Sequence, residues 1–373
     1  MSHRTVDDVE DRAERIEPGY GARPNGKSRD HHPSGRRKRL RPFKGLIDSA
    51  TFLKRMRPPD YIVDGLIMAG SSYTLTGNTG HCKTLIALMI AIRVARGEWL
   101  CGRQCRKGTV AFFAGENYDN VRVQYYSMCA ELGIEPPKNL VWHEGVCSIE
   151  QANTAIRKGL TAYPDLVLVI FDSLQAFFEG DDDSQNMQML DLAVGIRELT
   201  TGHPNRPASL VLAHPVKKAS RDNLLPRGGS SILNEFDGNF TAWREEDIVE
   251  LHWQGKFRGA PFDPVKLEAA VIKPEGLVDA RGDQMSCTVV RSLGPQREAE
   301  MTATGSSRLI RVLAVIHGNP GVTQSAIATA VGIARSTVQK DIGRLRKSKW
   351  LRDYDGKYVL TKEGEIALEL AGK

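Results

Sequence analysis

Short apolar runs alternate with amphipathic stretches between residues 60 and 285. Continuous apolar runs, which are typical of strands buried on both faces of a parallel sheet, occur at 71–77, 108–115, 165–174 and 208–214. Helical periodicity predicts helices over 83–96, 119–133, 148–160 and 186–200. This alternation predicts an α/β domain. Two later stretches are expected to add antiparallel hairpins to the sheet, at 238–259 and 265–272.

The pattern changes after residue 306. Periodicity predicts three helices, followed by two short strands around Asp355-Gly356, a pair that favours a tight hairpin turn. The helices are expected at 307–319, 323–333 and 334–349. Helix, helix, helix and hairpin is the order of a winged-helix module, which we assign to 306–373.

Two segments lack apolar periodicity. Residues 1–45 are rich in charge, glycine and proline, and are predicted to be a disordered basic tail. Residues 291–305 are polar and contain glycine and proline, which predicts a linker. The α/β domain is therefore expected to span 46–290.

The composition fits a globular protein of two domains. The chain has 373 residues, of which 41% are hydrophobic and 26% charged. No run of about 18 apolar residues predicts a membrane span, and the acidic N-terminus does not resemble a signal peptide. The six cysteines show neither a paired CxxC spacing nor a matching histidine cluster. Reduced thiols in a cytoplasmic protein are the expectation.

The net charge is +6, and its location is more informative than its size. The segment GRRKRLRPFK (35–44) contains six cations, and further arginines and lysines follow residue 335. Basic segments near both ends favour a nucleic-acid partner. The alternative is a solvated tail without a ligand.

The segment TLTGNTGHCKTLIAL (74–88) is close to the phosphate-binding pattern GxxxxGK[ST]. A strand enters it and a helix leaves it, so backbone N–H groups and a helix N-terminus would face a triphosphate. Lys83 is expected to reach the β- and γ-phosphates of ATP, and the Thr84 hydroxyl to ligate Mg²⁺. The predicted nucleotide-binding residues are Gly77, Asn78, Thr79, Gly80, His81, Cys82, Lys83, Thr84 and Leu85.

Cys82 stands where the pattern usually has glycine. A cysteine keeps the N–H donor but disfavours the backbone angles that glycine adopts there. The alternative to a nucleotide site is a tight strand–helix turn that binds no ligand.

Three polar residues follow predicted buried strands. Asp172 ends one strand and is expected to hold Mg²⁺, or else to cap the next turn. Glu116 follows another and would polarise the attacking water, or else serve as an N-terminal helix charge. His214 follows a third and would sense the γ-phosphate, or else be a structural histidine.

Residues 60–285 resemble the RecA-like ATPases of the plasmid RepA-type hexameric helicase group. The resemblance rests on YIVDGLIMAGSSYTLTGNTGHCKT, FFAGEN, VIFDSL, LAHPVKK, RGGSSILNEFDG and GKFRG. It implies a RecA-like P-loop NTPase core in which Glu116 is catalytic, Asp172 and Thr84 hold Mg²⁺, and His214 is a sensor. It also implies a hexameric ring in which Lys256 and Arg258 enter the ATP site of a neighbouring subunit.

Two groups of residues are expected to contact DNA. The loop after His214 would grip single-stranded DNA in the channel of such a ring, through Lys217, Lys218, Arg221 and Arg227. In the C-terminal module, the third helix would enter a groove of duplex DNA with Arg335, Ser336, Thr337, Gln339 and Lys340, and Arg344 would reach phosphates. The alternatives are a solvated loop and a winged helix that docks protein.

Two functions remain open from the sequence. The first is an ATP-hydrolysing oligomeric motor on single-stranded DNA, a replicative helicase of a plasmid, phage or mobile element. The alternative is an ATP-gated DNA-binding regulator or helicase loader with slow or no hydrolysis. The rate of ATP hydrolysis with and without single-stranded DNA distinguishes them.

Overall fold

The computed structural model describes residues 43, 45–54, 56, 58–179, 186–293, 308–354 and 357–371. Three predicted segments lie outside the described residues: most of the disordered tail, the linker from residue 294 onward and the turn pair at 355–356. One short helix, α1 (Ser49–Lys54), belongs to the described N-terminal segment.

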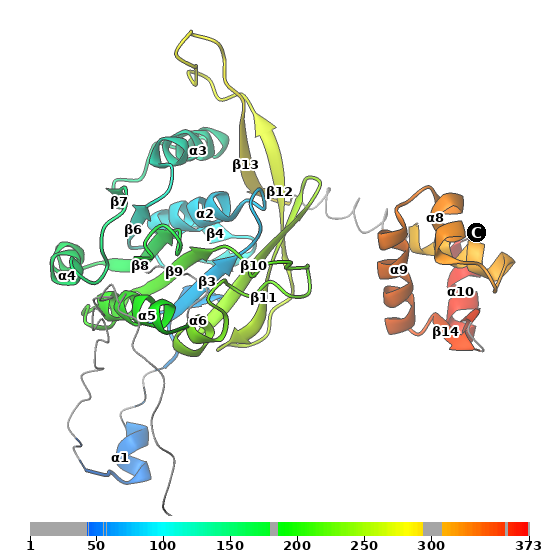
Figure 1. The fold of residues 1–373 in the computed structure, drawn as a ribbon, viewed down its shortest axis with the longest axis horizontal. Coiled ribbons are helices and arrows are strands. Elements are labelled where there is room, and N and C mark those ends of the chain that lie inside the picture. Colours follow the sequence, from blue (N-terminus) through cyan, green and yellow to red (C-terminus); the bar gives the residue numbers. More distant parts are fainter. Residues whose placement is uncertain are drawn as a thin grey trace, which may run out of the picture. The chain divides into compact units, whose positions relative to one another are not determined.

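A nine-stranded sheet forms the centre of the α/β domain, in the order β13-β12-β11-β10-β3-β9-β8-β6-β7 (Figure 1). Five neighbouring strands run parallel. They are β3 (Ser72–Thr76), β9 (Ala208–Ala213), β8 (Leu166–Asp172), β6 (Thr109–Ala114) and β7 (Leu140–Glu144). Every residue of the first four is buried, because helices cover both faces of this part of the sheet. The four apolar runs therefore form buried parallel strands, as predicted.

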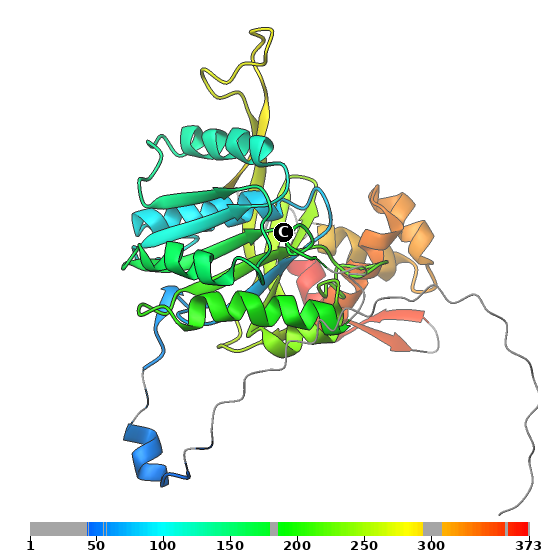
Figure 2. The ribbon, with the colours of Figure 1, turned by 60° about the vertical axis from the view of Figure 1, so that its left-hand side comes forward.

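Helices lie on both faces of the parallel strands (Figure 2). One hydrophobic cluster holds side chains of α2 (Lys83–Arg96) and α3 (Tyr118–Glu131). The other holds side chains of α4 (Asn153–Thr161), α5 (Asn186–Thr201) and α6 (Gly229–Glu235). The four predicted helices are present, although α4 begins at residue 153 instead of 148, since residues 149–152 form turns.

Four later strands extend the sheet from β3. They are β10 (Gly238–Glu245), β11 (Ile248–Phe257), β12 (Val265–Ile272) and β13 (Cys287–Ser292). β10 pairs with β3 in parallel, and β10, β11, β12 and β13 then pair antiparallel in succession. The predicted antiparallel additions are therefore present. β13 was not predicted, and it includes Arg291 and Ser292, the first two residues of the predicted linker.

Two small antiparallel pairs complete the α/β domain. They are β1 (Tyr61–Val63) with β2 (Ile67–Met68), and β4 (Trp99–Leu100) with β5 (Arg103–Gln104).

The C-terminal module has the predicted winged-helix order. Residues 308–318 are helical and precede α8 (Gln324–Val331), α9 (Arg335–Lys347), β14 (Leu351–Tyr354) and β15 (Lys357–Leu360). The Thr323 side chain accepts a hydrogen bond from the N–H of Ala326 and so caps α8, and Gly332 ends α8 with a φ of 72°. A separate core, including Val312, Ile327 and Leu345, holds the module together. An additional helix, α10 (Lys362–Ala371), was not predicted.

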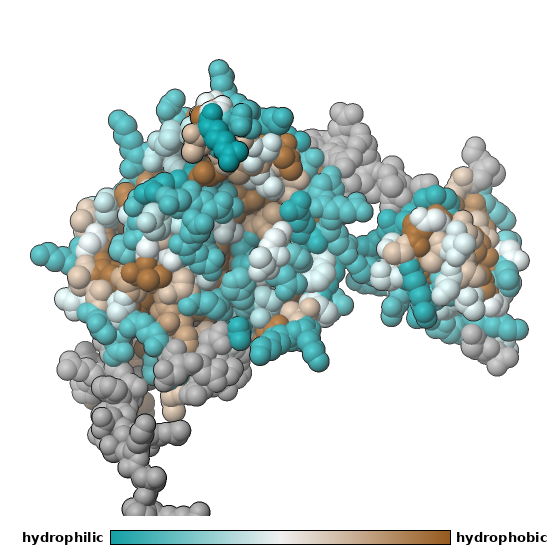
Figure 3. Space-filling view, turned by 45° about the horizontal axis from the view of Figure 1, so that its top comes forward, coloured by the Kyte–Doolittle hydropathy of each residue, from teal (hydrophilic) through white to brown (hydrophobic). Residues whose placement is uncertain are grey.

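Among the described residues, no helix has both the length and the apolar character that a membrane crossing requires. Hydrophilic side chains cover most of the face shown in Figure 3, and hydrophobic ones form small separate groups.

Candidate nucleotide-binding site

The P-loop, residues 77–84, connects the end of β3 to the start of α2. The Lys83 ammonium donates to the backbone carbonyls of Gly77 (2.8 Å) and Asn78 (3.2 Å), so the loop folds around this side chain. A Cβ at Gly77 would lie 2.7 Å from the carbonyl oxygen of Ala242, which makes glycine necessary there. Burial lowers the pKa of Lys83, although Asp172 and Glu116 oppose that effect.

Cys82 adopts a left-handed backbone conformation, with φ 62° and ψ 24°, immediately before α2. The glycine-type angle expected from the pattern is therefore present without the glycine. The Cys82 thiol lies 3.8 Å from the Gly80 carbonyl oxygen and 3.8 Å from Nη1 of Arg244. Burial raises the pKa of this thiol, so it stays protonated at neutral pH.

His81 fastens the P-loop to β10. Its Nδ1 atom accepts the backbone N–H of Arg244 at 3.1 Å, and its ring and that of Trp243 pack edge to face with centroids 4.9 Å apart. His81 therefore holds the loop against β10, while the carbonyls of Gly77 and Asn78 hold it around Lys83.

Asp172 and Thr84 meet at the predicted metal position. The Thr84 hydroxyl donates to Oδ2 of Asp172 at 2.9 Å. Asp172 is only 4% exposed, and this burial raises its pKa to about 6. A buried carboxylate next to a hydroxyl suits a hard cation, since Mg²⁺ in phosphate sites takes one or two protein oxygens and retains waters and substrate oxygens. The donor set therefore fits Mg²⁺.

Glu116 lies beyond the end of β6, between the Ser173 hydroxyl and the His214 ring. The Ser173 hydroxyl donates to Oε1 of Glu116, and Nε2 of His214 lies 3.7 Å from the same oxygen. The contact with His214 is the main reason why the pKa of Glu116 falls to about 2. Glu116 is therefore an ionised carboxylate, the form that a general base requires. The backbone N–H of His214 in turn donates to Oε1 of Gln175 at 3.2 Å.

One cavity of about 280 Å³ brings these groups together. Its lining includes Lys83 and Thr84 of the P-loop with Glu116, Asp172 and His214 from three strand ends. The sequence predicted each of these five residues. It also predicted the lining residues Thr79, Gly80, Cys82 and Leu85, but not Gln124 on α3, Arg244 on β10 or Thr288 on β13. Ser173 and Gln175, which contact Glu116 and His214, were also not predicted. Their position just after Asp172 was the only signal for them in the sequence, because they match no general motif.

Lys256 and Arg258 lie level with the start of β3, whereas their own P-loop follows its end. Phe257, between them, pairs with Gly238, and Gly238 pairs with Tyr73 at the start of β3. Because the P-loop follows the end of β3, about 13 Å of strand separates the two ends.

Both cations of this segment bind residues 233–237. The Lys256 ammonium donates to the carbonyls of Leu233 (2.6 Å) and Asn234 (3.0 Å). The Arg258 side chain is 65% exposed, and its Nη1 lies 2.9 Å from Oδ1 of the buried Asp237.

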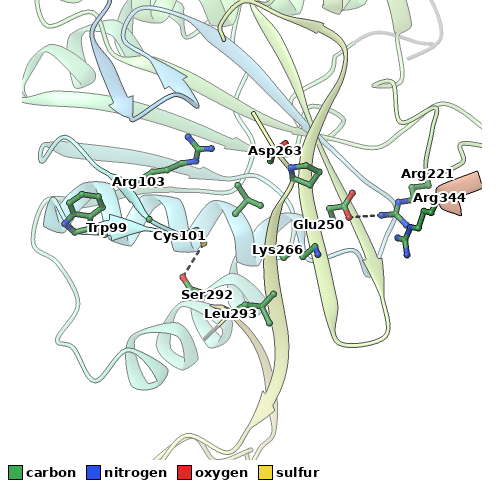
Figure 4. A pocket seen from close by; sticks show the side chains of 13 residues that line it. Trp99, Cys101, Arg103, Arg221, Glu250, Asp263, Lys266, Ser292, Leu293 and Arg344 are labelled. Carbon is green, nitrogen blue, oxygen red and sulfur yellow. Dashed lines mark hydrogen bonds and ion pairs between the residues drawn. The ribbon is translucent and has the colours of Figure 1, made fainter. Parts of the chain in front are cut away.

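The cationic loop, residues 215–227, begins directly after His214. Lys217 and Lys218 are exposed. Arg221 instead forms ion pairs with Glu250 (2.7 Å, Figure 4) and Glu245 (3.4 Å) on β11 and β10. Arg227 closes the loop, because its backbone N–H donates to the His214 carbonyl at 2.8 Å. The loop is therefore tied to the residue predicted to sense phosphate.

The predicted groove-reading residues occupy the exposed face of α9. Arg335, Ser336, Gln339, Lys340 and Arg344 are exposed, whereas Thr337 is partly buried. The other face of α9 packs into the core through Val338, Ile342 and Leu345. Such a face is available to DNA or to protein.

The described part of the chain contains no group of three or more His, Cys, Asp or Glu side chains arranged to hold a metal ion. All six cysteines are free. The Cys101 thiol faces the Ser292 hydroxyl at 3.3 Å (Figure 4).

Two family models match parts of this chain. Residues 36–220 match the family model described as an AAA domain, and residues 307–352 match that of a winged helix-turn-helix DNA-binding domain. The chain combines an AAA domain with a winged-helix module. The AAA domain as matched contains the P-loop, Glu116, Asp172 and His214, whereas Lys256 and Arg258 follow it.

One solved structure similar to this chain is the ATPase domain of another protein. It is 13% identical, the match covers 54% of this chain and 82% of that chain, and the TM-score is 0.42. No curated protein matches the chain.

Proposed function

We propose that this chain is an ATP-hydrolysing oligomeric motor that acts on single-stranded DNA. The observation that carries the proposal is the single cavity in which P-loop residues meet Glu116, Asp172 and His214. An AAA domain binds nucleotide, and this constellation supplies the groups that phosphoryl transfer to water requires. A replicative helicase of a plasmid, phage or mobile element is the function we favour.

The roles of the cavity residues follow from their chemistry. Lys83 compensates the charge of the β- and γ-phosphates, and Thr84 with Asp172 would hold Mg²⁺. When bound, Mg²⁺ neutralises charge on the phosphate oxygens. Glu116, ionised and fixed by Ser173, accepts the proton of the attacking water. His214 contacts Glu116 and directly precedes the cationic loop, so it would join the hydrolysis site to the DNA-binding segment.

The position of Lys256 and Arg258 supports assembly into a ring. Both residues lie at the sheet edge away from their own P-loop, so neither serves the ATP site of its own chain. A cation from a neighbouring subunit that faces the γ-phosphate stabilises the charge that develops in the transition state. We propose that Arg258 has this role, with Lys256 beside it, in a hexamer.

Hydrolysis of ATP by the full chain, with and without single-stranded DNA, tests the proposal. We expect clear stimulation by DNA. Lys83→Ala should abolish nucleotide binding or hydrolysis. Glu116→Gln should keep nucleotide binding and lose roughly 10²- to 10⁴-fold in rate, because the amide keeps the shape but accepts no proton. Wild-type turnover in Glu116→Gln would remove that residue from the mechanism.

The winged-helix module favours a second candidate, an ATP-gated DNA-binding regulator or helicase loader. Its exposed α9 face can bind duplex DNA without any motor activity. Absence of turnover under all conditions, together with ATP-dependent duplex binding, would establish this second function.

A chain that ends at residue 305 tests the role of the module. We expect weaker duplex binding and a shallower dependence on salt, because phosphate contacts are lost. Unchanged duplex affinity would mean that the module docks protein.

A further inference from the structure

A buried hydrogen-bond network joins the strand that enters the P-loop to the cationic loop. Its centre is Asn239 on β10, whose side chain is fully buried. Oδ1 of Asn239 accepts the hydroxyls of Thr74 (2.8 Å) and Thr76 (2.6 Å) on β3. Thr76 is the last residue of β3 and directly precedes Gly77, the first residue of the P-loop.

The other side of Asn239 holds the cationic loop. Nδ2 donates to the carbonyl of Leu224 (2.9 Å) and to that of Gln254 (3.1 Å). All four hydrogen-bonding positions of this amide are therefore used, two toward the P-loop strand and two toward the loop and β11.

The side chain of Gln254, on β11, forms two hydrogen bonds with the same loop. Its Oε1 accepts the backbone N–H of Leu224 at 2.6 Å, and its Nε2 donates to the carbonyl of Arg221. The loop is thus bound at its centre by two carboxamides, in addition to the closure at its base between His214 and Arg227.

We propose that Asn239 and Gln254 are positioning residues that couple the P-loop to the DNA-contacting loop 215–227. The inference rests on the proposed function and deepens it, because it names a connection that reaches the loop without His214. A buried amide with every position occupied leaves no spare partner, so a shift of Thr76 moves Asn239 or breaks a hydrogen bond at a cost. Nucleotide binding at the P-loop therefore biases the position of Leu224, and DNA at the loop biases the P-loop equally.

Gln254 is the better residue to change, since its side chain contacts only the loop, its backbone carbonyl stays available to Asn239 in a variant, and it lies outside the nucleotide cavity. Gln254→Ala should keep the basal rate and the KM for ATP within about twofold of wild type. Stimulation of hydrolysis by an oligo-dT strand should fall about fivefold or more, in the range of typical coupling between sites. A purely structural role would lower the melting temperature without changing the ratio of stimulated to basal rate.

Gln284→Ala is the matched control. It removes the same side chain, whose Nε2 donates to the carbonyls of Pro274 and Leu277 in the segment between β12 and β13. This control should be stimulated by oligo-dT like the wild type. If Gln254→Ala does not fold, Gln254→Glu serves instead, because it keeps the acceptor for Leu224 and lacks the donor to Arg221.

The outcomes separate this inference from the proposed function. A wild type that oligo-dT does not stimulate overturns the proposed function and the inference with it. A stimulated wild type together with an equally stimulated, folded Gln254 variant leaves the motor standing and overturns the coupling role.

Discussion

Cys82 shows how one backbone angle constrains a site. The P-loop requires a left-handed residue at this position, and a cysteine occupies it at φ 62°. For an L-residue this conformation costs roughly 1–2 kcal/mol, which the surrounding loop must offset. The thiol also approaches Arg244, a lining residue of the cavity.

Cys82→Gly should therefore relieve strain and bind ATP at least as tightly as the native chain. The greater freedom of glycine in the unfolded state offsets part of the gain, so we expect about 0.5–1 kcal/mol of added stability. Calorimetric titration with ATP and thermal unfolding measure the two effects. Cys82→Ala is the matched control, because it removes the thiol but keeps the strain. Weaker ATP binding in both variants would give the thiol a positive role.

Asp172 illustrates the cost of a buried functional carboxylate. Its pKa is about 6 in the folded chain, against 3.8 as the ordinary value, because burial disfavours its charged form. The folded state therefore holds the proton more tightly than the unfolded state. This contribution to stability is full below about pH 4 and is lost as the pH rises through about 6.

Asp172→Asn should raise the melting temperature of the nucleotide-free protein at pH 7.5, since it removes a penalty of about 3 kcal/mol. The difference from wild type should shrink as the pH falls from about 7 to about 4. Thermal unfolding across this range measures it. A pH-independent difference would mean that the burial of charge is not its cause.

At the scale of elements, one ion pair joins two helices of the winged-helix module. Asp341 of α9 is fully buried, and Arg308 of the preceding helical segment 308–318 donates to both its oxygens, at 2.7 and 3.0 Å. Nη1 of Arg344 also lies 3.6 Å from Oδ1 of Asp341, and both arginines keep contact with solvent, so only the carboxylate of this group is fully buried. The pair therefore fixes the orientation of α9, and with it the face predicted to contact DNA.

Asp341→Ala should accelerate hydrogen exchange of α8 and α9 in the full chain while the AAA domain remains protected. Asp353→Ala is the control, because Asp353 pairs with Arg346 on the exposed surface, where such pairs contribute at most about 1 kcal/mol. Equal protection of the module in both variants would show that the buried pair does not hold it together.

At the scale of the molecule, the P-loop and Arg258 lie at opposite ends of the strands. The P-loop follows one end of β3, and Arg258 lies at the other end, next to the buried Asp237. In the proposed ring of identical subunits, each chain would supply a phosphate loop to one site and a cation to the next.

Arg258→Ala should bind ATP and assemble, yet hydrolyse about 10³- to 10⁵-fold more slowly. Mixed with Lys83→Ala protein, it should form some sites with an intact P-loop and an intact cation, so activity should exceed that of either variant alone. Arg291→Ala, which removes another exposed arginine paired with acids, should hydrolyse ATP like the wild type. Co-assembly without any recovered activity would end the proposed role of Arg258 across subunits.

The sequence by itself determined the parts whose signal is local. The apolar runs around Asp172 and before His214 predicted buried parallel strands, because such strands need no alternation. The P-loop, Glu116, Asp172 and His214 were found because parallel strands place their carboxyl ends on one edge of the sheet. The winged-helix order was equally readable from helical periodicity and turn residues.

Tertiary structure decided what depends on residues distant in the chain. Arg244 and Thr288 enter the nucleotide cavity only because β10 to β13 extend the sheet beside the P-loop, and neither sits in a motif. Asn239 meets Thr76 across 163 positions of sequence. Arg221, predicted as a DNA contact, was found in ion pairs with Glu245 and Glu250, because strand pairing brings these acids beneath its loop. Periodicity reports which face of an element is buried, whereas the partner that buries it is set by the packing of the whole chain.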